Sequence, residues 1–519
     1  PTAYVGSQGE VVPMALNIAC LARESAKRYP DKAALLYDGG SLTFAQVDAL
    51  SDQLAAGLRS AGFVTGDVIG LQLPNIPQFV LSYFAILKAG CIVLPLNVML
   101  TAPEMAFQLG DAQARALVTW TGTAHAANKA AHAVGIDHLY VVETPGMPPA
   151  EVGEPLEALY RGLDPNVPPP FEQTDPGDTA VIVYTSGTTG TPKGAELTHF
   201  QLLLNAETPG RLFGVKNDDV VLVVLPLFHV FGLSSHLNIA MRFGATMSLV
   251  PRFDAAKVVE VIRRDAVTIF EGVPTMFLAL LHHPGITEAD IASLRIGISG
   301  GASLPAKVLD AFEAKFHITI LEGYGLTESA STTTFNTPEE RRPYSVGKPI
   351  WGVDVEIWGE GDQVMPPGAG HVGEVVIRGV NVMKGYFHDP ESTKHAFTRG
   401  WMRTGDLGYF DSEGYLFIVD RKKDLIIRGG YNVYPREIEE ALYGYPGVLE
   451  AAVIGVPDER LGEEVKAFVV PHAGVVLHQG EVTTYLKERL AAYKYPRYIE
   501  FRAEMDHGPT GKILKNNLR

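Results

Sequence analysis

The sequence predicts an α/β fold in which parallel sheets are flanked by helices, together with a β subdomain and a small C-terminal α+β domain. Two observations predict this class. Over the first two-thirds of the chain, short β-rich runs alternate with amphipathic helical patterns, which is typical of parallel sheets covered by helices. Near residue 420 this pattern gives way to a segment of short strands and helices with the size of a small domain. We therefore expect one large domain over residues 1–420 and a second over residues 421–519.

The expected elements follow from hydrophobic spacing. A helix is predicted over 44–58, because Val47, Leu50, Leu54 and Leu58 recur at helical spacing. A strand over 68–73, a helix over 77–89 and a strand over 92–94 come next. The same alternation recurs with strands at 179–184, 220–225 and 294–298, each followed by a loop that contains Gly or Pro. Ligands of parallel sheets bind in such loops.

Composition narrows the class of protein. The chain has 519 residues, of which 46% are hydrophobic and 20% are charged, as expected for a globular protein with more than one domain. A net charge of −16 argues against nucleic acid and anionic membranes as partners, since both are polyanions. The two cysteines, Cys20 and Cys91, lack the spacing of metal ligands or of a disulfide framework. Without a recognisable signal peptide or transmembrane segment, a cytoplasmic protein is expected.

One loop carries the clearest chemical signal. Directly after the strand-like run over 180–183, residues 184–194 read Tyr-Thr-Ser-Gly-Thr-Thr-Gly-Thr-Pro-Lys-Gly. Small residues let backbone N–H groups turn inward around phosphate oxygens, the hydroxyls add donors, and the lysine adds a positive charge. The loop is not a Walker A motif, because its spacing differs. Composition alone allows either a phosphate-binding loop or a flexible surface turn.

The order of residues in this loop resembles the signature loop of the adenylate-forming superfamily. That superfamily includes acyl-CoA synthetases, aryl-CoA ligases, the adenylation domains of nonribosomal peptide synthetases and beetle luciferases. Further motifs follow in the family's order across nearly the whole chain. The resemblance implies that the loop binds ATP through Thr185, Ser186, Gly187, Thr188, Thr189, Gly190 and Lys193.

Two later motifs resemble those that hold the adenine and the α-phosphate. Gly300-Gly301-Ala302 looks like the turn that lines the adenine site, which implies that Gly301 and Ala302 contact ATP. In the run 323–328, the resemblance implies that Tyr324 packs against adenine, Thr327 meets the α-phosphate and Glu328 holds Mg²⁺. A flat ring stacks on a base, and a carboxylate is a hard ligand for magnesium. Taken singly, each motif also fits a glycine-bounded surface turn.

A pair of motifs over 401–406 and 418–421 resembles the ribose site of the family. The resemblance implies that Asp406 and Arg421 bind the ribose hydroxyls and that Ile418 lies against the nucleotide. A carboxylate can accept hydrogen bonds from two neighbouring hydroxyls. An aspartate after glycine is also a common turn cap, which is the alternative for Asp406.

The resemblance extends into the C-terminal segment. Lys423 occupies the family's hinge, about which this domain rotates between adenylation and thioester formation, so we expect the domain to be mobile. Gly429 and Gly430 look like the loop that meets coenzyme A in the second state. Lys512 looks like the lysine that bridges the substrate carboxylate and the α-phosphate. The chain departs from the family just before it, where Met505-Asp506-His507 replaces the usual apolar-proline pair.

In the family, the acyl site is built largely from the segment after the strand that ends near Leu225. His229 matches a position that borders the substrate carboxylate, and we expect it to position rather than to transfer a proton; a core histidine is the alternative. No acidic residue occurs from Pro226 to Phe253, which disfavours a substrate that carries an ammonium group. The mostly apolar segment suits a fatty acid or an aryl acid.

These features together predict an ATP-dependent carboxylic acid–CoA ligase of fatty acid metabolism that uses ATP, Mg²⁺ and coenzyme A. Its catalytic residues would be Lys512, Thr327, Glu328 and His229. Acyl-AMP and pyrophosphate would form first, and acyl-CoA and AMP second. The alternatives are an aryl-CoA ligase, a stand-alone adenylation enzyme that loads a carrier protein, and a non-catalytic nucleotide-binding protein. No nucleic-acid partner is expected, and the sequence allows a homodimer.

Overall fold

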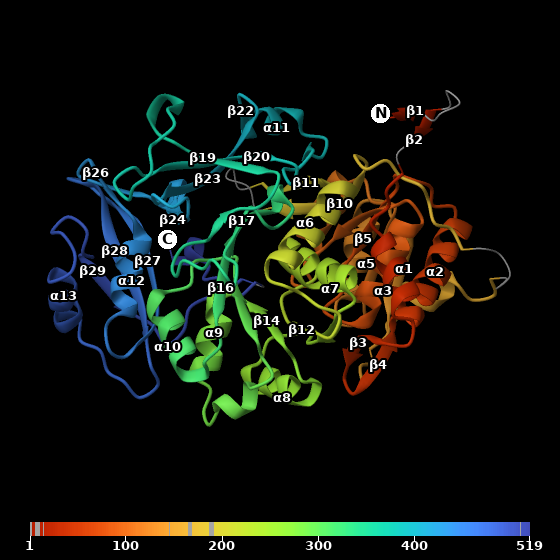
Figure 1. Ribbon diagram of the computed structural model, residues 1–519, viewed down its shortest axis with the longest axis horizontal. Helices are drawn as coiled ribbons and strands as arrows, with labels where there is room; N and C mark the ends of the chain where they lie inside the picture. The colour runs from red at the N-terminus through yellow and green to blue at the C-terminus, as the bar shows by residue number, and fades with distance from the viewer. Residues whose placement is uncertain are drawn as a thin grey trace.

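The structure is a computed structural model that describes residues 3–5, 11–13, 15–144, 146–163, 169–185, 191–508 and 510–518. Figure 1 shows the N-terminal elements at one end of the long axis, the C-terminal sheet at the other, and the remaining sheets between them. A short pair of strands, β1 (Ala3–Val5) and β2 (Val11–Pro13), precedes the first helix, α1 (Cys20–Arg28). Four larger sheets form the rest of the described architecture.

The eight-stranded sheet is parallel from β10 to β9 and antiparallel at its other edge. Helices cover both faces, since Ile69 and Leu71 pack with α2 and α3 whereas Val68 and Leu117 pack with α4 and α5. In sheet order the strands are β21 (Gly385–Tyr386), β11 (Lys193–Thr198), β10 (Thr179–Thr185), β6 (Ile92–Pro95), β5 (Val68–Leu71), β7 (Ala116–Trp120), β8 (His138–Val142) and β9 (Glu154–Pro155). The helices are α2 (Phe44–Ser60), α3 (Pro77–Lys88), α4 (Ala102–Asp111) and α5 (Ala124–Ala133).

The nine-stranded sheet is parallel from β16 to β3 and has antiparallel strands at both edges. In sheet order the strands are β18 (Lys348–Pro349), β17 (Thr334–Phe335), β16 (Ile320–Tyr324), β15 (Ile296–Ser299), β14 (Ile269–Gly272), β12 (Val220–Val223), β13 (Thr246–Leu249), β3 (Ala33–Tyr37) and β4 (Gly40–Thr43). One face is covered by α8 (Ala255–Asp265), α9 (Pro274–Leu281) and α10 (Ala306–Phe316).

The two large sheets share one hydrophobic core. Residues of β5, β6 and β10 belong to the same buried cluster as residues of β12, β14 and β15. The segments that fill this shared layer are α6 (His199–Leu212), the π-helical turn η2 (Gly232–Asn238) and α7 (Ile239–Phe243). A polar group also joins the layers, because the Asn75 amide donates to the carbonyls of Val223, Leu225 and Val250 at 3.0–3.2 Å.

Two smaller sheets complete the described chain. The first is antiparallel and consists of β19 (Val353–Trp358), β20 (Gly373–Gly379), β22 (Phe397–Thr398), β23 (Trp401–Phe410) and β24 (Leu416–Arg421), with α11 (Pro390–Ala396) beside it. The second consists of β25 (Ile426–Arg428), β26 (Tyr431–Val433), β27 (Val448–Asp458), β28 (Gly462–Pro471) and β29 (Tyr498–Phe501), with α12 (Pro435–Tyr443) and α13 (Gln479–Lys487). Within the described ranges, no helix is both long and apolar enough to cross a membrane.

The predicted fold class is confirmed, as are the individual elements that hydrophobic spacing indicated. The helix expected over 44–58 is α2, which begins at a capping box of Thr43 and Gln46. The helix expected over 77–89 is α3, with Pro77 in its first turn. The strands expected at 68–73 and 92–94 are β5 and β6. Those expected at 179–184, 220–225 and 294–298 are β10, β12 and β15.

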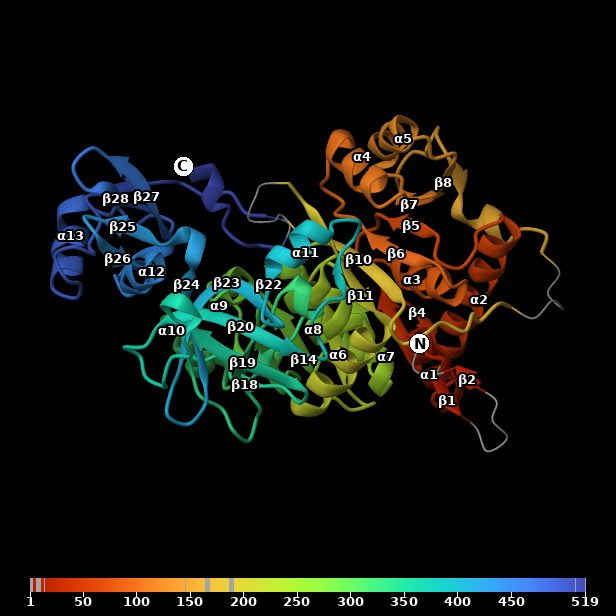
Figure 2. The ribbon, with the colours of Figure 1, turned by 90° about the horizontal axis from the view of Figure 1, so that it is seen from above.

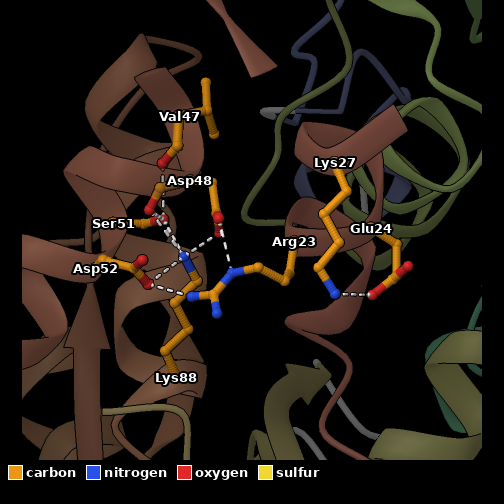
Figure 3. A network of polar contacts seen from close by, with 8 residues as sticks. All are labelled: Arg23, Glu24, Lys27, Val47, Asp48, Ser51, Asp52 and Lys88. Carbon is orange, nitrogen blue, oxygen red and sulfur yellow. Dashed lines mark hydrogen bonds and ion pairs between the residues drawn. The ribbon is translucent and has the colours of Figure 1, made fainter. Parts of the chain in front are cut away.

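A buried lysine ties the first three helices together. Lys88, the last residue of α3, is fully buried, and its Nζ lies 2.5 Å from Asp48 Oδ1 and 2.8 Å from Asp52 Oδ1. Both carboxylates also pair with Arg23 of α1 at 2.7 Å, and Ser51 accepts another hydrogen bond from Lys88. Figure 3 shows these side chains converging from α1, α2 and α3, and the exposed Lys27–Glu24 pair nearby. The network offsets the cost of burying a charge.

Removing the Lys88 charge should therefore cost much more stability than removing that of Lys27. We expect Lys88→Met to lower the free energy of unfolding by about 3–5 kcal/mol, because Asp48 and Asp52 lose a buried partner. Lys27→Met, the control, should change it by less than about 1 kcal/mol. Denaturant unfolding of both variants measures the difference, and equal destabilisation would contradict this account of the network.

Candidate active site

The residues that the motifs single out gather where the parallel strands of the nine-stranded sheet end. The segment after β12 carries His229, the turn after β15 carries Gly301 and Ala302, and the segment after β16 carries Thr327 and Glu328. Parallel neighbours end at the same edge of a sheet, so these loops lie beside one another. A final loop reaches this edge from the C-terminal sheet, as the dark-blue trace in Figure 2 shows.

The loop after β12 is held in place from both sheets. Asn75, which follows β5, accepts a hydrogen bond from Leu227 N at 2.9 Å while its amide donates to three carbonyls around the end of β12. Gly232 opens the π-helical turn η2, and a methyl group there would lie 2.3 Å from Pro226 O. Glycine is therefore required, and π-helical turns of this kind are common at functional sites.

His229 lies in this loop with a defined hydrogen-bonding state. Its Nδ1 accepts a hydrogen bond from Phe231 N at 3.2 Å, so the proton of the neutral ring lies on Nε2. Burial, together with the nearby charge of Lys512, lowers the pKa of His229 to about 3. The ring is thus neutral at physiological pH, which fits a positioning group better than a proton carrier.

The turn after β15 lies close to neighbouring side chains because Gly300 and Gly301 have no side chains of their own. Gly300 N donates to Gly272 O at 3.3 Å, and a methyl group at Gly300 would lie 2.9 Å from the Phe231 ring. Gly301 has a φ of +79°, a left-handed conformation that glycine adopts without strain. A methyl group there would lie 3.3 Å from Lys512 Cε, so this turn borders the lysine directly.

Lys512 is carried into the site by the final loop. The hydroxyl of Thr275, in the first turn of α9, donates to Gly511 O at 2.9 Å and anchors the loop. A tight turn closes the loop, since Gly508 N donates to Lys512 O at 2.7 Å. Burial, reinforced by the charge of Arg421, lowers the pKa of Lys512 to about 8, while the charge of Asp406 acts in the opposite direction. A cation is therefore held close to the neutral His229.

Asp406 links the site to the antiparallel sheet. It lies opposite Arg421 in the β23–β24 ladder, with Arg421 Nε 3.4 Å from Asp406 Oδ1. The hydroxyl of Tyr324 donates to Asp406 Oδ2 at 2.7 Å. Burial raises the pKa of Asp406, and the charge of Arg421 partly reverses this effect. Ile418 packs against the main core, and its carbonyl accepts a hydrogen bond from the guanidinium of Arg436.

A second group of residues surrounds Glu328. Its Oε1 accepts a hydrogen bond from the Tyr386 hydroxyl at 2.9 Å and lies 3.5 Å from Thr185 Oγ1. Lys193 Nζ lies 5.5 Å from the centroid of the Tyr386 ring. Thr185 and Lys193 pair at the two ends of the hairpin that carries the predicted phosphate loop. The intervening loop residues Ser186, Gly187, Thr188, Thr189 and Gly190 lie outside the described residues.

The donor set around Glu328 suits a magnesium ion that is shared with a phosphate. In the part of the chain that the structure describes, no group of three or more His, Cys, Asp or Glu side chains is arranged to hold a metal ion. Mg²⁺ usually takes one or two carboxylates and completes its shell with water and phosphate oxygens. A lone carboxylate beside the ends of a phosphate loop fits that pattern.

Not every predicted residue joins this cluster. Gly429 and Gly430 form the turn between β25 and β26, both with positive φ, and Gly429 N donates to Leu461 O within the C-terminal sheet. They contribute nothing to the cluster around Lys512. Lys423 is exposed in the short helix η6 (Lys422–Asp424), between β24 of one sheet and β25 of the next.

The orientation that places Lys512 is supported by contacts of the C-terminal segment with α10 and with β24. Glu440 of α12 accepts a hydrogen bond from Ala306 N at 3.1 Å, at the start of α10. Lys307 Nζ donates to Gly444 O at 3.1 Å. Arg436 N donates to Asp420 Oδ2 at 3.0 Å. Apolar and aromatic contacts join the same interface, since Leu449 of β27 packs against the cluster of α8, α9 and α10, and the ring centroids of His282 and His472 lie 4.5 Å apart.

Sequence reasoning missed three residues that organise this site. Tyr386 binds Glu328 from 58 positions away, Thr275 anchors Gly511 from 236 positions away, and Asn75 joins both large sheets. None belongs to a motif that the sequence singled out. The only hint was Asn75 itself, a polar residue between a strand and a predicted helix, where loops of parallel sheets carry ligand-binding or structural groups.

Comparisons with known proteins agree with this geometry. Residues 22–387 match the family described as AMP-binding enzyme, and residues 437–512 match the AMP-binding enzyme C-terminal domain. A long-chain-fatty-acid–CoA ligase of Bacillus subtilis is 38% identical over 97% of this chain and 94% of the relative. A feruloyl-CoA synthase of Amycolatopsis sp is 38% identical over 95% of this chain and 96% of the relative. The structure of the anthranilate CoA ligase AuaEII with anthranoyl-AMP aligns with a TM-score of 0.91 at 30% identity, covering 98% of this chain and 97% of that one.

The seating of the final loop can be tested at Gly511. Its φ is +76°, and a methyl group there would lie 2.9 Å from Val273 Cγ2 and 3.0 Å from Thr275 Oγ1. Gly474 has a similar φ of +78° but nothing within 4 Å. We expect Gly511→Ala, but not Gly474→Ala, to raise hydrogen exchange of the amides around 508–514, because only the first substitution obstructs docking. Equal protection of this loop in the two variants would show that Gly511 does not seat it.

Proposed function

This chain belongs to the AMP-binding enzyme family as an AMP-forming acid–thiol ligase, and from that premise we propose its acid and the roles of its site residues. The relatives named above are CoA ligases, and the family reaction forms an acyl-AMP from ATP and then an acyl-CoA. The proposed acid is a fatty acid. An aryl acid is the second candidate, because relatives of equal identity are named for a fatty acid and for ferulate.

The observation that carries the proposed mechanism is the burial of Lys512 beside the Gly301 turn, close enough for its charge to act on the pKa of His229 and for the charges of Asp406 and Arg421 to act on its own. In the first half-reaction, an oxygen of the substrate carboxylate attacks the α-phosphorus of ATP and pyrophosphate leaves. Lys512 neutralises the two anions that must approach each other, and His229 orients the acid without changing its charge. In the second half-reaction, the thiolate of coenzyme A attacks the acyl carbon, and the bond between that carbon and the AMP phosphate oxygen breaks, so that AMP leaves.

The nucleotide would lie across the strand ends. Tyr324 would pack against the adenine, which Gly301 and Ala302 border, and Asp406 and Arg421 would bind the ribose hydroxyls beside Ile418. Thr327 would meet the α-phosphate, while Thr185, Lys193 and the loop between them would hold the other phosphates. Glu328 would hold Mg²⁺, which, when bound, supplies positive charge to the departing pyrophosphate. Tyr386 joins this set as the residue that fixes the Glu328 carboxylate.

Thioester formation is proposed to use a second orientation of the C-terminal domain. The boundary near residue 420 is supported by the chain passing from β24 of one sheet to β25 of another within a few residues, with Lys423 between them. A rotation there would bring Gly429 and Gly430 to the site, where their small size would leave space for the thiol arm of coenzyme A. A carrier-bound thiol is the alternative acceptor, and free coenzyme A tells the two apart.

The test of the proposed function is acid-dependent pyrophosphate release from ATP and Mg²⁺. Short, medium and long fatty acids, aryl acids and amino acids would each be supplied with and without coenzyme A. We expect release with fatty acids, and AMP plus an acyl-CoA when coenzyme A is present. Release with aryl acids alone would replace the proposed substrate, and adenylate that never becomes a thioester with free coenzyme A would indicate a carrier-bound acceptor.

The lowered pKa of Lys512 gives the first half-reaction a defined pH dependence. A lysine with a pKa of about 8 is charged below that pH and loses its charge above it. We therefore expect kcat/KM for ATP to fall as the pH rises from 8 to 9.5, by up to about tenfold per pH unit. His229 stays neutral over this range, since its pKa is about 3.

The matched variant is Lys512→Arg, whose guanidinium keeps its charge in this range. Its activity, whatever the absolute level, should not fall between pH 8 and 9.5. A wild-type rate that stays constant over the same interval would show that the charge of Lys512 is not needed for adenylation.

A further inference from the structure

Glu271 is a buried acid that the mechanism does not use. It lies on β14 with only 1% of its surface exposed, and neither carboxyl oxygen has a hydrogen-bond partner among the described residues. Burial raises its pKa to about 8, so the group is mostly protonated at neutral pH. A buried polar group without a partner destabilises a fold, so a carboxyl in this state is better explained by a ligand than by packing.

The side chain faces the layer shared by the two large sheets. Successive residues of a strand point to opposite faces, so Glu271 lies on the same face as Ile269 and opposite to Phe270. Ile269 packs in the cluster that contains Leu233 and Leu237 of η2, whereas Phe270 packs with the helices on the other face. Glu271 pairs with Ile298, which belongs to the same cluster as Ile269. Its carboxyl therefore lies on the face covered by η2.

Glu271 is also close to the reacting groups along the strand. The next residue, Gly272, accepts a hydrogen bond from Gly300 N, and a methyl group at Gly511, next to Lys512, would lie 2.9 Å from Cγ2 of the following residue, Val273. One residue of a strand advances about 3.3 Å. An acid whose carboxylate meets Lys512 and His229 at the strand ends would thus extend its acyl group inward, along the face on which Glu271 lies.

The interior on this face is more polar than the sequence of the acyl segment indicated. That segment has no acid between Pro226 and Phe253, but Glu271 is supplied by a different strand. In η2, His236 is also fully buried, and neither of its ring nitrogens has a hydrogen-bond partner among the described residues. A purely hydrocarbon acyl group would leave such atoms unsatisfied.

We propose that Glu271 determines specificity by hydrogen bonding to an oxygen substituent, a hydroxyl or a carbonyl, on the acyl part of the acid. The favoured substrates are then oxygen-substituted fatty or aryl acids rather than their unsubstituted counterparts. This inference rests on the proposed function. A protonated carboxyl both donates and accepts a hydrogen bond, so it suits a neutral oxygen group. An ammonium substituent would instead require Glu271 to ionise in a buried site, which is costly.

The test compares matched acids that share one carbon skeleton. Fatty acids with a hydroxyl or oxo group at successive positions, and ring-hydroxylated phenylpropanoic acids, are paired with the unsubstituted acids, and kcat/KM is measured for each. For the wild type we expect at least one oxygen-substituted acid to be favoured by about tenfold or more, because a site built for a hydroxyl rejects the analogue that lacks it.

Two variants of Glu271 and one control separate specificity from stability. Glu271→Gln keeps a donor and an acceptor and should keep the preference. Glu271→Met should bring the ratio of kcat/KM between the oxygen-substituted and the unsubstituted acid close to one. It should also lower KM for the unsubstituted acid. Glu322→Gln is the control, since Glu322 is another buried acid with a raised pKa but lies on the opposite face of the sheet, beside Ile320. It should leave the ratio unchanged.

The failure of this inference is distinguishable from that of the proposed function. If no acid supports pyrophosphate release by the wild type, the proposed function fails. If acids are turned over but no oxygen substituent is favoured by the wild type, if amino-substituted acids are favoured instead, or if Glu271→Met keeps the preference, the role of Glu271 is refuted. Should Glu271→Met not fold, Glu271→Leu takes its place as the apolar variant, and a preference that Glu271→Leu keeps refutes the role of Glu271 equally.

Discussion

The buried charge of Lys512 is the interaction on which the rest of the site depends. It arrives from the C-terminal segment, yet its neighbours are His229 and Gly301 of the nine-stranded sheet and Asp406 of the antiparallel sheet. Burying an ammonium group is costly unless opposite charge is near, and in the described chain Asp406 supplies it. Phosphate and carboxylate groups of the substrates would supply more. Burying the Lys512 charge is therefore costly without substrates, and the same charge stabilises the complex once the anionic substrates are bound.

Under the proposed function, the lysine also explains why the chain would be divided into a large N-terminal part and a C-terminal domain near residue 420. Under the proposed function the final loop would enter for one step and leave for another, and the interface is held by hydrogen bonds such as those of Thr275 with Gly511 and Glu440 with Ala306, beside the packing of Leu449 on the helices of the nine-stranded sheet. The N-terminal part is built differently. Its two large sheets share one apolar core, and buried polar groups such as Asn75 and Lys88 fix how its layers meet. The proposed function thus sets this densely packed platform opposite a lysine that would move between the two steps.

Much of this fold and site could be predicted from the sequence, for identifiable reasons. Helices and strands such as α2, α3, β5 and β10 are amphipathic or apolar over their own length, so local spacing reveals them. Tyr324, Asp406, Arg421 and Lys512 stand in short runs whose order is informative, and the structure brings them together. Gly429 and Gly430 lie away from the cluster around Lys512. Their motif could not predict this position, because the resemblance implies two orientations of the C-terminal domain and does not say which one the structure has.

What could not be predicted depends on contacts between distant parts of the chain. Tyr386, Thr275 and Glu271 occupy ordinary positions in strands or helices, and nothing in their neighbourhoods sets them apart. Only Asn75, a polar residue between a strand and a predicted helix, gave a hint. Each of the four acquires its role from a partner on another element, or, for Glu271, from the lack of one. Tertiary packing decides such roles, and local sequence does not encode it.

The central claim, that Lys512 serves the first half-reaction through the docked final loop, is tested most directly by measuring both half-reactions of Lys512→Ala. Adenylate formation would be followed as acid-dependent pyrophosphate release, and thioester formation would be followed from supplied acyl-AMP and coenzyme A. The account predicts that the first is abolished while the second is spared, because the lysine acts only in the orientation described here. Loss of both half-reactions in a folded variant, or loss of neither, would contradict it.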